Sequence, residues 1–266
     1  MSLIATRGYK TRRKHNSYEK VMSCLRFYKN YIIAVPGLGR VRFHKQVIPE
    51  GKVKCGRILR KASGWYMALS IDTKCKPIRR IANGVVGIDP GFSTLLTLST
   101  GETVAHPREL EKLETRIAQA QRGGDKQLTA RLQERRANRV KDRNHKISLR
   151  LVQQNEFIAF SKDSHKAIAK TFGKSVSSSS HYQLRQMLAY KSRSGGTRYV
   201  EVEPAFSTMT CSSCGARNGP KGLGGLAVRV WECACGAQHD RDKNSACNIL
   251  KLGLGLSLNA SNNGIN

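Results

Sequence analysis

Residues 211–250 read CSSCGARNGPKGLGGLAVRVWECACGAQHDRDKNSACNIL. Two cysteine pairs, Cys211–Cys214 and Cys233–Cys235, bracket a glycine-rich loop, and the acidic run 240–242 follows the second pair. Two thiolate pairs on two knuckles form the tetrahedral four-sulfur site that suits zinc. The pattern of Asn244–Leu250 indicates a helix, so this stretch predicts a metal-stapled ribbon that places a carboxylate at a helix start.

The second cysteine pair is C-x-C, one residue shorter than the usual C-x-x-C knuckle. Three interpretations are open: a structural zinc site, a knuckle that has lost its metal, and a mixed site that recruits His239. Cys247 has the position of a helix-packing residue. The spacing favours structural zinc, with these ligands: Cys211, Cys214, Cys233 and Cys235.

The chain is strongly basic. Its 266 residues carry 47 Lys and Arg against 18 Asp and Glu, a formal net charge of +29. Such a surplus favours a polyanionic partner, because Lys and Arg side chains neutralise phosphates and so provide affinity for nucleic acid. The alternative is a surface that is merely basic.

Neither a secretory signal nor a membrane-spanning run is expected. No segment has the basic and apolar regions of a signal peptide or the ~20 apolar residues that span a bilayer. We therefore expect no membrane partner and a cytoplasmic location, in the bacterial cytosol or nucleoid. Clustered cysteines in a reducing compartment indicate metal rather than disulfides.

Residues 1–80 are predicted to form a basic arm and a small β-barrel. Short β-branched and aromatic runs between residues 24 and 78 are separated by P-G-L-G, P-E-G and A-S-G, the spacing of a small barrel. The basic side chains expected to contact nucleic acid here are Arg12, Arg13, Lys14, Arg40, Arg42 and Lys45.

Residues 81–210 predict a second domain. V-V-G-I-D-P-G is an apolar strand that ends in Asp89, and residues 108–153 predict a helical hairpin with Gly123 and Gly124 in its turn and Asp125 as N-cap. The hairpin is basic on one side, which is either a solvated face or a face toward a nucleic-acid duplex. These residues are Arg131, Arg135, Arg136, Arg139 and Lys141.

Further elements follow the hairpin. Residues 157–160 predict a buried strand, 175–191 a Ser-rich helix start with an amphipathic helix, and 197–204 another strand. The ribbon then covers 211–238 and a last segment 239–252. Residues 253–266 are predicted to be a flexible tail.

Asp89 at a strand end and the pair Asp240 and Asp242 at a helix start are candidate metal ligands. Carboxylates that a fold draws together hold Mg²⁺ ions for phosphodiester hydrolysis. A lone Asp before Pro-Gly is common in turns, so the prediction depends on the D-R-D-x-N run after the cysteines.

The sequence resembles the TnpB family of transposon-encoded RNA-guided nucleases, which are related to type V CRISPR effectors. G-I-D-P-G-F-S-T-L-L-T-L-S-T-G-E resembles its first RuvC motif, and H-D-R-D-K-N-S-A-C-N-I-L its third. L-R-Q-M-L-A-Y-K resembles its arginine-bearing helix, with Arg185, and L-G-R-V-R-F and G-W-Y-M-A-L-S its wedge barrel. V-E-V-E-P-A-F-S-T-M-T-C-S-S-C-G resembles its fifth strand and zinc ribbon.

The resemblance implies a mixed α+β and α/β fold: a wedge-type β-barrel and an RNase-H-like (RuvC) domain with an inserted helical hairpin and a zinc ribbon. It also implies a guide RNA, a double-stranded DNA target, structural Zn²⁺ and, if the RuvC site is active, Mg²⁺. Asp89 and Asp242 match two of the three metal-binding acids of the family.

The third acid departs from the family pattern. Ser161 stands where the family has a glutamate, and Pro204 stands at the position that carries it in some relatives. The substitutes nearby are Glu203 and Asp163, but Glu203 is one residue out of place, which turns it to the other face of a strand. A second departure is in the N-terminal part of the sequence, where most of the family's helical recognition lobe is expected to be absent.

Three hypotheses follow. The first is an RNA-guided DNA-binding protein with a degenerate RuvC site that represses transcription without cleavage. The second is an active Mg²⁺-dependent RNA-guided DNA endonuclease that serves transposon maintenance, with Asp89, Asp242 and either Glu203 or Asp163 as its acids. The third is a truncated transposon remnant.

Overall fold

The computed structural model describes residues 17–20, 25–28, 31–35, 38–73, 77–162, 180–221 and 224–262. The chain divides into two units. The first unit comprises Met1–Lys76 and Ile117–Arg135, and the second comprises Pro77–Arg116 and Arg136–Asn266. Within the described part of the chain, no helix has the length and apolar character needed to cross a membrane.

Strands in the first unit form two antiparallel sheets of three strands each. Ile33 and Val35 are buried between the sheets, and Ile58 and Met67 pack against them. One sheet contains β1 (Ser17–Lys20), β5 (Lys52–Lys61) and β6 (Gly64–Asp72). The other contains β2 (Arg26–Tyr28), β3 (Ile32–Val35) and β4 (Gly39–Arg42).

The closed barrel expected here is not found in the described residues. Each sheet pairs only within itself, so the strands form two open sheets that share a small apolar core. The short-strand pattern predicted the strands, but closure depends on pairing between edge strands, and sequence alternation carries no signal for that pairing.

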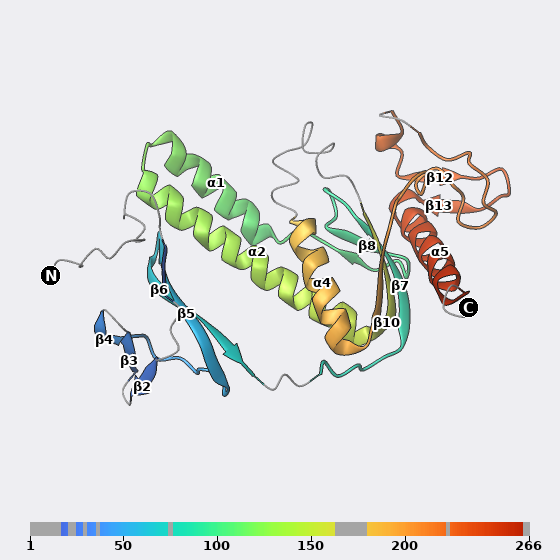
Figure 1. Ribbon diagram of the computed structural model, residues 1–266. Helices are drawn as coiled ribbons and strands as arrows, with labels where there is room; N and C mark the ends of the chain where they lie inside the picture. Colours follow the sequence, from blue (N-terminus) through green and yellow to red (C-terminus); the bar gives the residue numbers. More distant parts are fainter. Residues whose placement is uncertain are drawn as a thin grey trace. The chain divides into compact units, whose positions relative to one another are not determined.

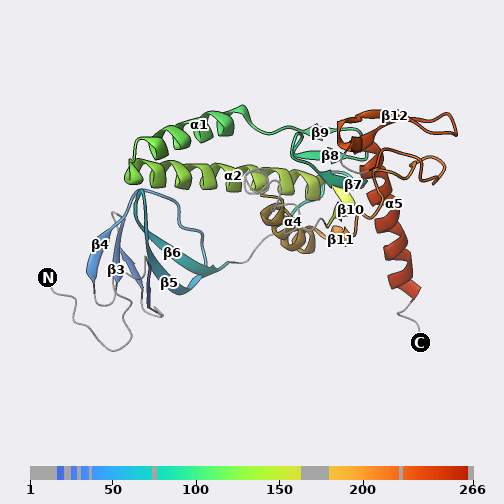
Figure 2. The ribbon, with the colours of Figure 1, turned by 90° about the horizontal axis from the view of Figure 1, so that it is seen from above.

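The predicted helical hairpin is present. Helix α1 (Arg108–Arg122) and helix α2 (Lys126–Gln154) turn back on each other at Gly123–Asp125 (Figures 1 and 2). Gly124 has a φ of 72°, a conformation that glycine adopts without strain. The Asp125 carboxylate accepts a hydrogen bond from the backbone N–H of Leu128 at 2.8 Å, which is the expected N-cap.

A five-stranded mixed sheet is the centre of the second unit, in the order β11-β10-β7-β8-β9. β10 is parallel to both β7 and β11, whereas β7–β8 and β8–β9 are antiparallel. The strands are β7 (Gly84–Pro90), β8 (Leu96–Leu98), β9 (Thr103–Val104), β10 (Asn155–Ser161) and β11 (Arg198–Val202).

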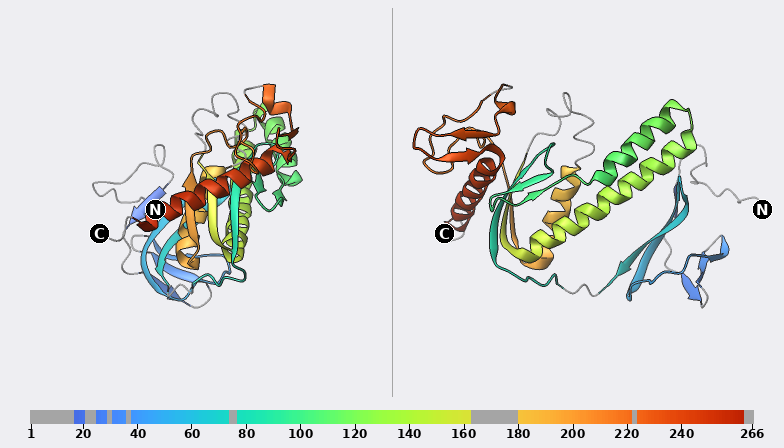
Figure 3. Two further views of the ribbon diagram at one scale, coloured as in Figure 1. Left: turned by 90° about the vertical axis from the view of Figure 1, so that its right-hand side faces the viewer. Right: turned by 180° about the vertical axis from the view of Figure 1, so that it is seen from behind.

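Helices cover both faces of this sheet (Figures 1 and 3). Ile88 and Phe160, both fully buried, belong to the cluster that α2 and helix α4 (His181–Gly195) cover. Phe157 and Ala159 belong to a second cluster with helix α5 (Arg241–Asn262). Since side chains alternate between the faces of a strand, Gly87 and Asp89 on β7 and Ser161 on β10 lie on the α5 face.

Residues 253–262 correct one prediction, since they continue helix α5 instead of beginning a flexible tail. The glycines that weakened the helical pattern have a packing role at Gly253, which is buried. A Cβ atom at Gly253 would lie 2.5 Å from the Cβ of Ala159, so glycine permits the close approach of α5 to β10.

The cysteine-rich region lies between β11 and α5 in the chain. It contains the 3-10 helix η1 (Gly224–Ala227) and the antiparallel pair β12 (Val230–Glu232) and β13 (Gln238–Asp240). Side-chain hydrogen bonds tie this region to α5: the amide oxygen of Asn244 accepts from the N–H of Ser212 at 2.8 Å.

Two glycines of α5 give a matched test of this packing. Gly253→Ala should lower the free energy of unfolding by about 1–3 kcal/mol, because the added methyl overlaps Ala159. Gly255→Ala should raise it by about 0.5–1 kcal/mol, because nothing lies within 4 Å of its Cβ position and alanine favours helix. Urea denaturation measures both, and equal effects of the two changes would contradict the packing of α5.

Candidate metal and nucleic-acid site

A cavity of about 470 Å³ lies where β7 ends and α5 begins. The sheet and the helix converge there, so Asp89 at the end of β7 and Asp242 in the first turn of α5 line the same space. The predicted pairing of these two acids is therefore present in the fold. The charged side chains that line the cavity are Asp89, Lys221, Arg229, Arg241 and Asp242.

Asp242 is held by two arginines. Its Oδ2 atom accepts from Nη1 of Arg229 at 3.1 Å, and its Oδ1 atom accepts from Nε and Nη2 of Arg241 at 3.1 and 3.0 Å. Both carboxylate oxygens are thus engaged. The lining carries three cationic and two anionic side chains, so the cavity favours an anion more than a cation.

Asp240 has a different role from Asp242. Its Oδ1 atom accepts from the backbone N–H of Lys243 at 2.8 Å, which makes it the N-cap of α5. A carboxylate at this position also complements the positive end of the helix dipole. Asp240 therefore fixes the start of the helix that carries Asp242.

Ser161 lies beside Asp89. Phe160 pairs with Ile88 in the parallel β10–β7 ladder, so Ser161 and Asp89 are the next residues along their strands and share the α5 face. Ser161 is only 1% exposed, and its buried hydroxyl has no hydrogen-bond partner in the described structure. At the position where the resemblance leads us to expect a carboxylate, this chain has a neutral group.

Of the two substitute acids, Glu203 does not line the cavity. Glu203 follows Val202, which is buried on the α5 face, and strand alternation turns the next side chain away. Its side chain is 75% exposed and its Oε1 atom is 3.6 Å from Nζ of Lys162. Pro204 has no acid to contribute, and Asp163 lies outside the described residues.

A pair of Mg²⁺ ions does not fit this donor set. Mg²⁺ requires anionic oxygen ligands, and a two-metal site needs enough of them to hold both ions. The described lining supplies Asp89 and an Asp242 whose oxygens both accept from guanidinium groups. Ser161 adds no negative charge, so we derive no metal-dependent step from this cavity.

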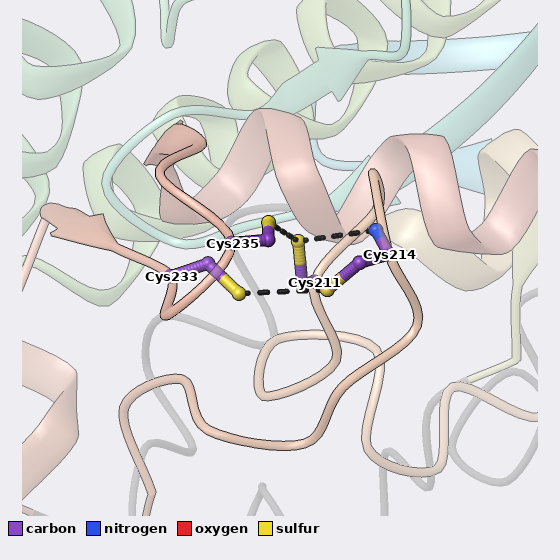
Figure 4. Close-up of side chains that lie close together, drawn as sticks. All are labelled: Cys211, Cys214, Cys233 and Cys235. Atoms are coloured by element: carbon purple, nitrogen blue, oxygen red, sulfur yellow. Dashed lines mark hydrogen bonds between the residues drawn. The ribbon is translucent and has the colours of Figure 1, made fainter.

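The four predicted zinc ligands come together. The sulfur atoms of the four cysteines all lie within 4.8 Å of one another, and they come from two loops that face each other (Figure 4). Gly215 and Gly236 follow the two pairs with φ near 82° and 83°, which closes each loop tightly. The C-x-C pair therefore reaches the cluster despite its shorter spacing.

Hydrogen-bond donors lower the pKa of two of these thiols, Cys211 and Cys233. The backbone of Ala237 lowers the pKa of Cys235, but the neighbouring thiols of Cys233 and Cys214 raise it to about 12. Burial raises the pKa of Cys211, but the N–H groups of Cys214 and Ser213 together with His239 lower it to about 5. Hydrogen bonding to the backbone N–H of Cys235 lowers the pKa of Cys233. Adjacent thiolates repel, so four of them ionise together only around a cation, and the set fits tetrahedral Zn²⁺.

His239 supports the cluster from its side. Its Nε2 atom is 3.0 Å from the sulfur of Cys211, and its ring lies 4.8 Å from that of Trp231. Among the described residues, the side chains close enough together to hold one metal ion here are the four cysteines. The geometry therefore favours the four-sulfur site over the mixed site. Cys247 is apart from the cluster, with its sulfur 3.5 Å from the carbonyl of Ser99.

Most of the predicted basic residues that the structure describes are exposed. In the first unit Arg40, Arg42, Lys45, Arg131 and Arg135 face solvent, and the Arg40 guanidinium lies 5.1 Å from the Tyr28 ring centre. In the second unit Lys141 is exposed, Arg139 is half-buried and Arg136 pairs with Glu114 at 3.2 Å. Arg12, Arg13 and Lys14 lie outside the described residues.

Arg185, which the resemblance to the family helix places among the nucleic-acid contacts, is mostly buried in the structure. Its side chain is 11% exposed and its Nη2 atom is 2.5 Å from Glu201 Oε2. Glu201 also accepts from the Tyr199 hydroxyl at 3.0 Å. The ion pair fastens α4 to β11, which gives the guanidinium a structural contact inside the protein. Sequence spacing alone gives no sign of this, since Glu201 is sixteen residues away.

Arg229, Arg241 and Lys221 are functional candidates that the sequence did not single out. Arg229 lies in an alternating V-R-V-W run, which is the pattern of any half-exposed strand. Arg241 lies between Asp240 and Asp242, the residues that the sequence identifies as candidate metal ligands. For Lys221 and Arg229 the available signal was the excess of cations in the glycine-rich segment between the two cysteine pairs, whereas Arg241 lies outside that segment.

Two families match this chain. The family described as "Probable transposase" (OrfB_IS605) matches residues 70–162, and the one described as "Cas12f1-like, TNB domain" matches residues 181–249. A protein named "Putative RNA-guided DNA endonuclease" from Streptomyces pristinaespiralis is 33% identical over 212 residues, covering 74% of this chain and 52% of that protein.

Two further relatives carry related names. "TnpB-like protein L79" of Acanthamoeba polyphaga mimivirus is 38% identical over 126 residues, covering 44% of this chain and 23% of its own. "CRISPR-associated endodeoxyribonuclease Cas12f1" of Sulfoacidibacillus thermotolerans is 24% identical, covering 82% of this chain and 58% of its own. The chain thus spans about half the length of the curated relatives with the longer matches.

A solved structure has the same fold. The chain in "Cryo-EM structure of the Cas12f1-sgRNA-target DNA complex" matches with a TM-score of 0.51 and 18% identity, covering 73% of this chain and 55% of that one. The observed mixed α/β fold is therefore one that resembles Cas12f1. At this identity the likeness concerns the fold alone.

Metal content tests the cysteine cluster. Purified protein should contain about one zinc ion per chain by elemental analysis, and Cys235→Ser should lose it and melt at a lower temperature, because structural zinc stabilises the folded state. His239→Gln should keep the zinc. A variant pair with the reverse behaviour would identify the mixed site, and zinc-free wild-type protein would show that the knuckle has lost its metal.

Proposed function

Because this chain is a relative of the TnpB family, we propose that it binds DNA under the direction of a guide RNA and does not cut it. Its RuvC-like site is degenerate and its retained surfaces serve binding. Base pairing between guide and target supplies the sequence specificity, while basic side chains hold the phosphate backbones.

The RNase-H-like interpretation of the second unit rests on its topology. Three antiparallel strands, β7 to β9, are followed by β10 and β11, which add in parallel on the other side of β7. In this arrangement the carboxyl end of the first strand is the place for catalytic acids. Asp89 stands at that end, and α5 brings Asp242 to the same cavity.

The observation that carries the proposal is the neutral residue beside Asp89. Ser161 occupies the adjacent position on the neighbouring strand, buried and facing α5. Glu203 is exposed beside Lys162. A site with two acids, one of them paired to two arginines, retains its shape but lacks the charge to hold two divalent ions.

Repression follows if the guided complex stays on a promoter. A protein that reads its target by base pairing and leaves both strands intact dissociates only as fast as the paired region unwinds, so it blocks other proteins from the same sequence. The zinc ribbon would then be a structural element, since its contacts through Asn244 and Ser212 hold α5 in place.

The rival function is an active RNA-guided endonuclease, which the names of the relatives favour. It requires Asp89 and Asp242 to be joined by Glu203, after a rearrangement of the strand end, or by Asp163. A transposon remnant is the third candidate. It predicts that the protein aggregates or binds RNA without selectivity.

Cleavage assays separate these candidates. Wild-type protein with its co-purified RNA should bind matching DNA in Mg²⁺ and leave it intact. Ser161→Glu should gain Mg²⁺-dependent cutting, because it returns a carboxylate to the position next to Asp89. The buried charge should also make this variant less stable than wild type in EDTA, with partial recovery in Mg²⁺.

Asp89→Asn in the Ser161→Glu background is the matched control, and it should abolish the regained cutting. If wild-type protein cuts the DNA and Asp89→Ala stops it, the active endonuclease is the correct function and the degenerate site is refuted.

A further inference from the structure

Phe206 has an unusual backbone conformation for an aromatic residue. Its φ is 60°, in the left-handed region that glycine occupies without strain, yet 51% of the residue is exposed. Apolar burial therefore does not account for keeping a large side chain in this place. Such outliers cluster at ligand-binding sites, where the surrounding structure holds them.

The loop after Phe206 fixes this conformation. The Phe206 carbonyl accepts three hydrogen bonds: from the N–H of Met209 at 3.0 Å, the N–H of Thr210 at 2.9 Å and the Thr210 hydroxyl at 3.0 Å. The next side chain, Ser207, is buried and contacts the Ser245 hydroxyl of α5 at 2.9 Å. The ring is consequently presented from a rigid support.

Arg217 stacks on the ring, with its guanidinium carbon 4.6 Å from the ring centre. The two segments that carry this pair are joined by a hydrogen bond from the N–H of Gly219 to the carbonyl of Met209 at 2.9 Å. Met209 and Lys221, a few residues farther along the respective segments, line the cavity that contains Asp89. The Phe206–Arg217 pair is therefore carried by the same two segments that supply Met209 and Lys221 to the cavity lining.

We propose that the Phe206–Arg217 pair is a stacking platform for an unpaired base of single-stranded nucleic acid. The phosphates next to that base would lie against Lys221, Arg229 and Arg241 in the neighbouring cavity, whose lining is more cationic than anionic. An aromatic ring flanked by guanidinium groups is the combination on which bases stack without regard to sequence. A protein partner would require a larger apolar surface than this one ring.

The platform deepens the proposed function, and it rests on that proposal only for the source of the unpaired strand. A guide that pairs with one DNA strand displaces the other, and a nuclease-like cavity without cutting activity is free to retain it. Stacking on the Phe206 ring adds a contact to a base of the displaced strand, which a surface that binds only phosphates does not provide.

Phe206→Gly is the informative variant because stability and binding should move in different directions. Glycine relieves the backbone strain, so the melting temperature should stay the same or rise. Affinity for a labelled oligothymidine, measured by fluorescence anisotropy in EDTA without guide RNA, should fall about 5-fold to 150-fold, the value of one base stacked on an aromatic ring.

An abasic oligonucleotide of the same length separates stacking from charge. Wild-type protein should prefer the thymine-bearing strand, and Phe206→Gly should lose that preference while binding the abasic strand as wild type does. Tyr190→Ala removes another aromatic residue with 50% exposure in the second unit, and it should change neither affinity. Phe206→Trp should keep or strengthen the preference.

An unchanged preference in Phe206→Gly would overturn the platform, and so would an equal loss of affinity for both strands. Because the assay contains neither guide nor duplex, its result is independent of guided DNA binding. A failed platform leaves the proposed function standing, and failed guided binding leaves the platform standing.

Discussion

The close contact between helix α5 and strands β7 and β10 is the constraint on which the second unit depends. Gly87 has no room for a Cβ atom, which would overlap the carbonyl oxygen of Ala246, and Gly253 meets Ala159 in the same way farther along the helix. With two glycines at the interface, α5 lies directly on the sheet. Its first turn then meets the end of β7, so Asp242 and Asp89 share a cavity.

The same contact explains why the fold accommodates a neutral Ser161 beside Asp89. The fold needs glycines, apolar side chains and the Asp240 cap to position α5, and none of these depends on a carboxylate at Ser161. The two arginines on Asp242 compensate its charge within the protein. The cavity therefore keeps its form without a carboxylate at Ser161, and its lining includes the cationic side chains of Lys221, Arg229 and Arg241.

Much of this organisation is predictable from local pattern. The hairpin of α1 and α2, the cap at Asp125 and the meeting of four cysteines follow from periodicity, capping chemistry and ligand spacing. The ion pair of Arg185 with Glu201, the arginines on Asp242 and the open sheets of the first unit depend on which distant segments meet. The helix through residues 253–262 was not predicted because a glycine that permits close packing cannot be distinguished, in the sequence, from a glycine that ends a helix.

The most direct test of guided binding without cutting is made in the cells that produce the protein. The tagged protein is recovered, its bound RNA is sequenced, and its DNA occupancy and DNA breaks are mapped in the same cells. One enriched RNA, with occupancy at a matching promoter and no breaks there, is the predicted result. Breaks at the occupied sites, or the absence of any discrete RNA, would contradict it.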